Sequence, residues 1–113
     1  VHELVGKVVG RTCVIVDDMI DTAGTIVQAA DALFDNGAAE VIVASTHALL
    51  SGPAVERLSD SRISEVVVTD TLPIPEENRF EKLTVLSIAP LIARAIREVF
   101  DEGSVTSLFD GNA

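Results

Sequence analysis

Apolar runs rich in β-branched residues alternate along this chain with segments of helical periodicity, and this alternation constrains the fold more than any other feature. Strands are predicted at residues 12–16, 40–45, 65–69 and 83–87. A shorter stretch at residues 5–9 precedes them, and helices are predicted at residues 25–36, 51–58 and 87–100. Strands that alternate with helices are typical of βαβ units on a parallel sheet. The chain is therefore expected to form an open, mainly parallel α/β sheet flanked by helices.

The polarity of these segments predicts how each is buried. Residues 12–16 show no alternation of polar and apolar side chains, so this strand is expected to be buried on both faces. The last helix is expected to bury one face, formed by Leu91, Ile92, Ala95, Ile96, Val99 and Phe100. The single cysteine, Cys13, lies inside the first apolar run. It cannot form an internal disulfide, which indicates a structural thiol and a cytoplasmic protein.

The composition excludes several classes of protein. A net charge of −10, from 18 acidic and 8 basic residues, disfavours binding to nucleic acids and to anionic membranes. No apolar run approaches the roughly 18 residues of a membrane-spanning helix, and no secretory signal is evident. The 113 residues, which do not begin with Met, are expected to be one domain that belongs to a longer, N-terminally truncated protein.

An acidic and hydroxyl-rich segment follows the first buried strand and leads into a helix. It reads Asp17-Asp18-Met19-Ile20-Asp21-Thr22-Ala23-Gly24-Thr25. Carboxylates at the carboxyl end of a central strand are costly unless a ligand or a partner uses them. Because Asp17 and Asp18 point to opposite sides of a strand, one could hold ribose hydroxyls or a metal-bound water while the other balances a basic group or orients the loop.

Residues 21–25 combine small side chains, two hydroxyl groups and the start of a helix. Free N–H groups and the helix dipole form an anion-binding site there, and it suits a phosphate monoester. Mg²⁺ would be the natural counter-ion, because it prefers oxygen ligands. The alternative is structural: Asp18 or Asp21 could simply cap the helix.

The same nine residues resemble the phosphoribosyl-binding motif of type I phosphoribosyltransferases, whose loop reads T-T/S-G-G-T/S. The form found here, with Asp21 at the first position, is similar to that of ribose-phosphate pyrophosphokinases (PRPP synthetases). Further segments resemble that family, namely Ser45-Thr46-His47, Ser51-Gly52-Pro53-Ala54, Val68-Thr69-Asp70-Thr71, Val85-Leu86-Ser87-Ile88-Ala89-Pro90 and Gly103-Ser104-Val105-Thr106-Ser107-Leu108-Phe109. On this resemblance, residues 1–113 are a C-terminal, phosphoribosyltransferase-like domain of a longer enzyme.

The resemblance implies an activity and a division of the site. Enzymes of this family transfer the diphosphoryl group of ATP, with Mg²⁺, to the 1-hydroxyl of ribose 5-phosphate. It implies that Asp17 and Asp18 hold the ribose hydroxyls, and that the 5-phosphate is held by Asp21, Thr22, Ala23, Gly24 and Thr25. The family's ATP-site residues and catalytic Lys and Arg residues have no counterpart in this chain, so the chain alone is expected to be inactive.

The resemblance also implies assembly and regulation. The family forms hexamers that ADP inhibits and phosphate activates, and Ser104, Thr106 and Phe109 match positions of that effector site. An exposed tail without a ligand is an equal alternative for these three residues. His47 follows a strand, where a histidine is more often satisfied by hydrogen bonds to a loop than used as a ligand.

Three other functions remain to be distinguished. A phosphoribosyltransferase would use PRPP rather than make it, and a non-catalytic protein that associates with the synthetase would keep the fold without the activity. A signalling receiver domain would need a phosphate-accepting Asp at the end of a later strand, and residues 40–45 and 83–87 end without one.

Overall fold

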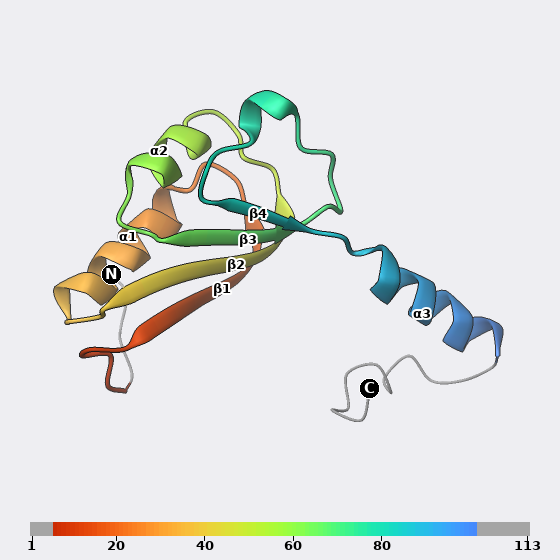
Figure 1. The fold of residues 1–113 in the computed structure, drawn as a ribbon, viewed down its shortest axis with the longest axis horizontal. Coiled ribbons are helices and arrows are strands. Elements are labelled where there is room, and N and C mark those ends of the chain that lie inside the picture. The colour runs from red at the N-terminus through yellow and green to blue at the C-terminus, as the bar shows by residue number, and fades with distance from the viewer. Residues whose placement is uncertain (1–5, 102–113) are drawn as a thin grey trace.

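The computed structural model of the protein describes residues 6–101. The elements are β1 (Thr12–Ile20), α1 (Gly24–Asp35), β2 (Glu40–Ala48), α2 (Ala54–Asp60), β3 (Glu65–Thr69), the 3-10 helix η1 (Glu76–Asn78), β4 (Leu83–Leu86) and α3 (Ala89–Phe100). The four strands form one parallel sheet in the order β1-β2-β3-β4 (Figure 1). The predicted α/β class with a parallel sheet is confirmed.

This strand order places α1 and α2 on the same face of the sheet. Each strand is added on the same side of its predecessor, and right-handed crossovers then put the connecting segments on one face. The core lies between this face and the two helices. Its main members are Val41 and Val43 of β2, Val66 and Val68 of β3, Ile26 and Ala30 of α1, and Ala54 and Leu58 of α2.

The prediction that the first strand is buried on both faces is wrong. In β1, Cys13 and Ile15 are half-buried against the core, whereas Val14 is 56% exposed and Val16 is 79% exposed. The physical reason is that β1 is an edge strand of a sheet whose second face no helix covers within residues 6–101. An apolar run therefore indicated a strand here, but not how many of its faces are covered.

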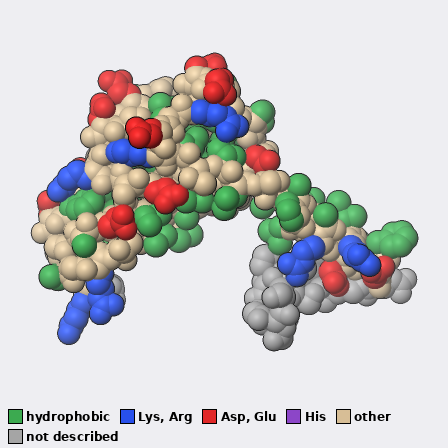
Figure 2. Space-filling view, in the orientation of Figure 1, with side chains coloured by type: hydrophobic (Ala, Val, Ile, Leu, Met, Phe, Trp, Pro, Cys, Tyr) green, Lys and Arg blue, Asp and Glu red, His purple; other side chains and the backbone are tan. Residues whose placement is uncertain are grey.

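The prediction of a buried face on the last helix is also wrong for the chain as described. Ile96 is 64% exposed and Phe100 is 84% exposed, and α3 contains no buried residue. The helix leaves the end of β4 and extends beyond the sheet (Figure 1), and hydrophobic side chains gather along it (Figure 2). Among residues 6–101, no helix is both long and apolar enough to cross a membrane.

Other boundaries follow the sequence more closely. The predicted helix at residues 25–36 is confirmed as α1, and Gly37, with φ of 98°, follows its end as the Asn-Gly pair predicts. Residues 6–9 form no strand, although the expected turn is present where the Arg11 N–H donates to the Val8 carbonyl at 3.0 Å. Both β1 and β2 continue further than predicted.

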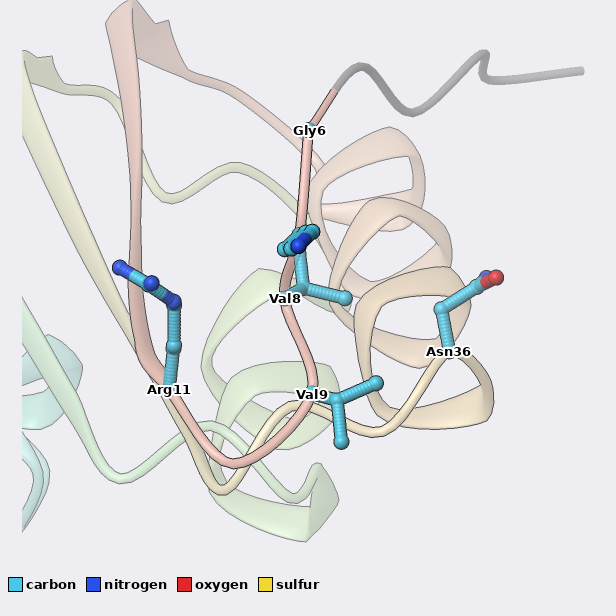
Figure 3. A pocket seen from close by; sticks show the side chains of 6 residues that line it. Gly6, Val8, Val9, Arg11 and Asn36 are labelled. Carbon is cyan, nitrogen blue, oxygen red and sulfur yellow. The ribbon is translucent and has the colours of Figure 1, made fainter.

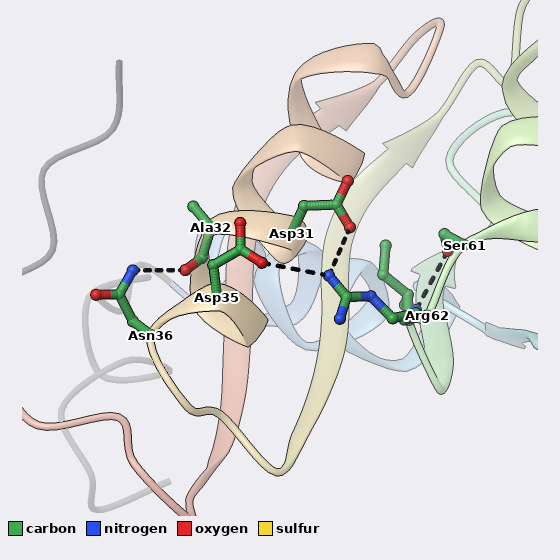
Figure 4. A network of polar contacts seen from close by, with 7 residues as sticks. Asp31, Ala32, Asp35, Asn36, Ser61 and Arg62 are labelled. Atoms are coloured by element: carbon green, nitrogen blue, oxygen red, sulfur yellow. Dashed lines mark hydrogen bonds and ion pairs between the residues drawn. The ribbon is translucent and has the colours of Figure 1, made fainter.

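Arg62 links the segment after α2 to α1 at the surface. Its Nη2 atom lies 3.3 Å from Asp31 Oδ1 and 3.8 Å from Asp35 Oδ1 (Figure 4). Its guanidinium lies 4.5 Å from the centre of the Phe34 ring. All three charged side chains are more than half exposed. Solvent screening therefore limits what this network contributes to stability.

We expect Arg62→Ala to lower the free energy of unfolding by less than about 1 kcal/mol, because exposed ion pairs and cation–π contacts are individually weak. Urea denaturation of the variant and of the parent chain measures this change. Arg79→Ala is the matched control, since its ion pair with Glu76 is 3.8 Å long and its side chain is 48% exposed, against 57% for Arg62. A loss above about 2 kcal/mol for Arg62→Ala would show that the contact between α1 and α2 depends on this network.

Candidate functional site

The first strand runs through the two acidic residues instead of ending before them. β1 stays in register with β2 through the pairs Asp17↔Ser45, Met19↔His47 and Ile20↔Ala48. The prediction that the strand ends at Val16 is therefore wrong, because backbone pairing with β2 continues where the apolar run stops. The loop itself begins at Asp21.

A cavity of about 220 Å³ lies where β1 gives way to α1. It is lined by Asp17, Met19, Asp21, Thr22, Ala23, Gly24, Thr25 and Ile26. The structure thus brings together six of the seven side chains predicted to bind the sugar phosphate. Asp18 does not line this cavity, which agrees with the expectation that neighbouring strand residues point to opposite sides. Met19 lines it without having been predicted as a site residue.

The start of α1 presents N–H groups that find no acceptor among the described residues. Ala23 precedes the helix in the left-handed conformation, with φ of 68°, and no side chain of the described part of the chain caps the helix. The first helical bond runs from the Val27 N–H to the Ala23 carbonyl at 3.0 Å. Within residues 6–101, no acceptor pairs with the N–H groups of Thr25 and Ile26. The alternative that Asp18 or Asp21 serves as a helix cap is therefore not what the structure shows.

Three successive carbonyl groups fix the loop from the side of α2. The Ile20 carbonyl accepts the N–H groups of Leu49 and Leu50 at 2.9 Å and 3.1 Å, and the Asp21 carbonyl accepts the Ser51 N–H at 2.8 Å. The Thr22 carbonyl accepts Nη1 of Arg57 at 3.1 Å. Leu50 is buried and has a φ of 53°, so strained backbone lies on both sides of this contact.

Sequence reasoning did not find Arg57, which is 35 residues from its partner. No local pattern marks such a residue, since the contact exists only once α2 packs against the sheet. Residues at the other strand ends were partly foreseen. The His47 ring is satisfied by a loop as predicted, with Nδ1 2.7 Å from the Thr71 hydroxyl. Asp70 accepts the Ile88 N–H at 2.8 Å and so fixes the approach to α3.

Asp17 and Ser45 are register partners on β1 and β2, and each carries a polar group without a partner among the described residues. Asp17 Oδ1 accepts the N–H of Asp18 at 2.8 Å, which leaves its second oxygen without a hydrogen bond to the described residues. Ser45, its register partner on β2, is buried, and its hydroxyl has no partner among residues 6–101. No three His, Cys, Asp or Glu side chains come together as a metal-binding group in this part of the chain.

A larger cavity, of about 440 Å³, lies at the amino end of β1 (Figure 3). Its walls come from residues 6–9, from Arg11 and from Asn36 at the end of α1. It shares no residue with the cavity at the loop, and it lies at the end of the sheet where parallel strands begin. Ligands of open α/β sheets bind beyond the carboxyl ends of the strands, so the smaller cavity is the better candidate site.

Residues 2–110 match the family model described as the phosphoribosyl synthetase-associated domain. The chain belongs to that family. It is 67% identical over 110 residues to a ribose-phosphate pyrophosphokinase of Streptomyces avermitilis, a match that covers 97% of this chain and 34% of the relative. A protein of the same name from Mycobacterium tuberculosis is 59% identical over 112 residues, which cover 99% of this chain and 34% of that protein.

A solved structure supports the same family. The crystal structure of phosphoribosylpyrophosphate synthetase from Mycobacterium smegmatis superimposes with a TM-score of 0.82 at 56% identity, covering 88% of this chain and 33% of that one. The phosphoribosyl synthetase-associated domain thus spans about a third of the length of the curated relatives it matches. The predicted effector residues Ser104, Thr106 and Phe109 lie outside the described residues.

Proposed function

We propose that this chain supplies the ribose 5-phosphate-binding part of a ribose-phosphate diphosphokinase, which transfers diphosphate from ATP to ribose 5-phosphate. The observation that carries the proposal is the cavity at the loop, where unpaired helix-start N–H groups and two Thr hydroxyls lie together with the Asp17 carboxylate. The names of the Streptomyces and Mycobacterium relatives support the same activity.

In this proposal each side of the cavity receives one part of the substrate. The N–H groups and hydroxyls of residues 21–25 accept the 5-phosphate, because a helix start favours negative charge. The unpaired oxygen of Asp17 accepts a hydrogen bond from a ribose hydroxyl. Transfer of a phosphoryl-type group needs mainly positioning, so the role of this chain is to hold and orient the sugar. The predicted contact of Asp18 with the sugar stays a prediction, because Asp18 does not line the cavity.

Mg²⁺ belongs to the proposal as the counter-ion of the phosphates. The described residues offer carboxylate oxygens at Asp17 and Asp18, which suit this ion, but no group of three acidic or His ligands. Substrate oxygens and water would therefore supply most of its ligands. Bound there, Mg²⁺ would offset the charge of the transferred diphosphate.

The rest of the enzyme is also a proposal, since the chain spans about a third of its relatives. We propose that this third is the C-terminal, type I phosphoribosyltransferase-like part, and that the remainder binds ATP. On the same basis we propose a cytoplasmic homo-hexamer with ADP and phosphate as effectors. Within that assembly Ser104, Thr106 and Phe109 would belong to the effector site.

Asp17→Ala and Thr25→Val test the two sides of the cavity in the intact enzyme. We expect each to raise the KM for ribose 5-phosphate about tenfold, because each removes one hydrogen bond to a polar or charged ligand group. The KM for ATP should change less than twofold. Asp60→Ala, at the exposed end of α2, is the matched control and should leave both constants unchanged. If both site variants behave like the control, the site assignment is wrong.

Binding distinguishes the transferase alternative. A ribose-phosphate diphosphokinase should bind ribose 5-phosphate at this loop without a second phosphorylated group, whereas a phosphoribosyltransferase should prefer PRPP. Calorimetric titration of the intact protein with each sugar phosphate measures the difference. Binding of PRPP at least tenfold tighter than ribose 5-phosphate, together with no AMP release from ATP, would favour the transferase.

A further inference from the structure

We infer that Arg57 is a positioning residue for the sugar phosphate: it turns the N–H group of Ala23 in the loop toward the cavity and adds positive charge behind it. The inference rests on the proposed function, because it concerns the same loop. Arg57 does not line the cavity. It therefore acts on a ligand through the loop and not by contact.

A hydrogen bond joins the Arg57 side chain to the loop. Nη1 of Arg57 lies 3.1 Å from the Thr22 carbonyl oxygen, and it lies 3.1 Å from the point that a Cβ atom on Gly24 would occupy. The guanidinium thus donates a hydrogen bond to the backbone of Thr22 and lies beside Gly24. A Cβ atom at position 24 would require the guanidinium to shift by a few tenths of an ångström.

The geometry of the peptide bond relates the direction of each loop carbonyl to that of the next N–H group. In a trans peptide, the carbonyl of one residue and the N–H of the next point in opposite directions. The carbonyls of Ile20, Asp21 and Thr22 are all held by donors from the segment between Leu49 and Arg57. The N–H groups of the three following residues therefore point away from that segment.

These three N–H groups are free to bind a ligand. Within residues 6–101, no acceptor pairs with the N–H groups of Asp21, Thr22 and Ala23. The hydrogen bonds to the Ile20 and Asp21 carbonyls are donated by backbone N–H groups of the loop after β2, so no single side chain controls them. The hydrogen bond to the Thr22 carbonyl is donated by the Arg57 side chain alone, and it fixes the orientation of the peptide between Thr22 and Ala23.

Arg57 also carries a positive charge near the loop, and the buried side of α2 holds its backbone in place. The described part of the chain places no carboxylate within 4 Å of the Arg57 guanidinium, in contrast to Arg62, which contacts Asp31 and Asp35. The charge of Arg57 is thus not neutralised by an ion pair there, and it adds to the positive potential of the helix start. Its backbone is well fixed, because Ala54 and Leu58 on the same helix are fully buried.

The test uses the intact enzyme, Arg57→Met and Arg57→Lys. We expect Arg57→Met, which removes the donor and the charge at similar length, to raise the KM for ribose 5-phosphate about tenfold. The KM for ATP, kcat and the melting temperature should change little, because the side chain is exposed. Arg57→Lys should recover part of the loss, since an ammonium keeps the charge but lacks the planar fork.

Arg62→Met is the matched control, because this exposed arginine lies five residues away and does not touch the loop. A KM for ribose 5-phosphate within twofold of the parent value for Arg57→Met would overturn the inference, provided that Thr25→Val keeps its effect. An equal loss of affinity for ATP and ribose 5-phosphate, with a lowered melting temperature, would also overturn it as a general structural effect. If Asp17→Ala and Thr25→Val also leave the KM for ribose 5-phosphate unchanged, the proposed function itself has failed.

Discussion

Ala23→Val is expected to raise the KM for ribose 5-phosphate about a hundredfold in the intact enzyme. Ala23 is 4% exposed and has a φ of 68°, in the left-handed region that β-branched residues rarely adopt. The left-handed conformation costs a residue with a Cβ atom about 1–2 kcal/mol, and two added methyl groups in a buried position cost about 1–3 kcal/mol more. The loop can relieve this strain only by changing the conformation that aims its N–H groups.

The size of the effect follows from the bonds that would be lost. A hydrogen bond to a charged group contributes about 1.5–3 kcal/mol, and each 1.4 kcal/mol is tenfold in affinity. Turning one or two loop N–H groups away from the phosphate is therefore expected to lower the affinity for ribose 5-phosphate by about two orders of magnitude. Steady-state kinetics with ribose 5-phosphate varied, and separately with ATP varied, measure the change and show whether it is confined to the sugar phosphate.

Two variants control for simple destabilisation. Ala30→Val adds the same methyl groups to a 2% exposed position within α1, where the backbone has ordinary helical geometry. It should lower the melting temperature without a selective rise in the KM for ribose 5-phosphate. Ala23→Gly relieves the left-handed strain and should keep the parent KM. If Ala23→Val and Ala30→Val have the same kinetic effect, the special backbone at Ala23 does not matter for binding.

Much of the site could be predicted because its information is local. A run that passes from strand to helix within residues 17–25 carries the hydroxyls, the small residues and the carboxylates in one short segment. The cavity accordingly collects Asp17 and residues 21–25. The end of β1 was misjudged, because polarity marked the strand only to Val16 while pairing with β2 continues to Ile20.

The features that could not be predicted depend on contacts between distant parts of the chain. Arg57 reaches Thr22 only through the packing of α2 against the core, and nothing around position 57 marks that contact. Whether the apolar sides of β1 and α3 are covered or exposed also depends on contacts with distant parts of the chain. Periodicity correctly gave α3 an apolar face, with Ile96 and Phe100 on it, but periodicity does not say whether residues 6–101 contain anything to cover that face.

The isolated 113-residue chain is expected to release no AMP from ATP in the presence of ribose 5-phosphate and Mg²⁺. Its cavity of about 220 Å³ accounts for one sugar phosphate, and among residues 6–101 Arg57 is the one cationic side chain that donates a hydrogen bond to the loop. A net charge of −10 opposes the approach of ATP unless further cations are supplied. Without a second bound substrate the advantage of positioning is lost, and this advantage alone can exceed about 10⁴-fold in rate.

A coupled assay for AMP, run beside the intact enzyme, measures this loss, and NMR titration of the isolated chain tests whether the loop still binds ribose 5-phosphate. We expect shifts at the N–H groups of residues 21–26 that saturate, and Thr25→Val in the same chain should weaken them. Turnover by the isolated chain near that of the intact enzyme would contradict the division of labour, because it would place the ATP site within these 113 residues. Binding without turnover is the expected result, since in the proposed function the loop holds and orients the sugar phosphate while the attack on ATP requires groups that this loop does not contain.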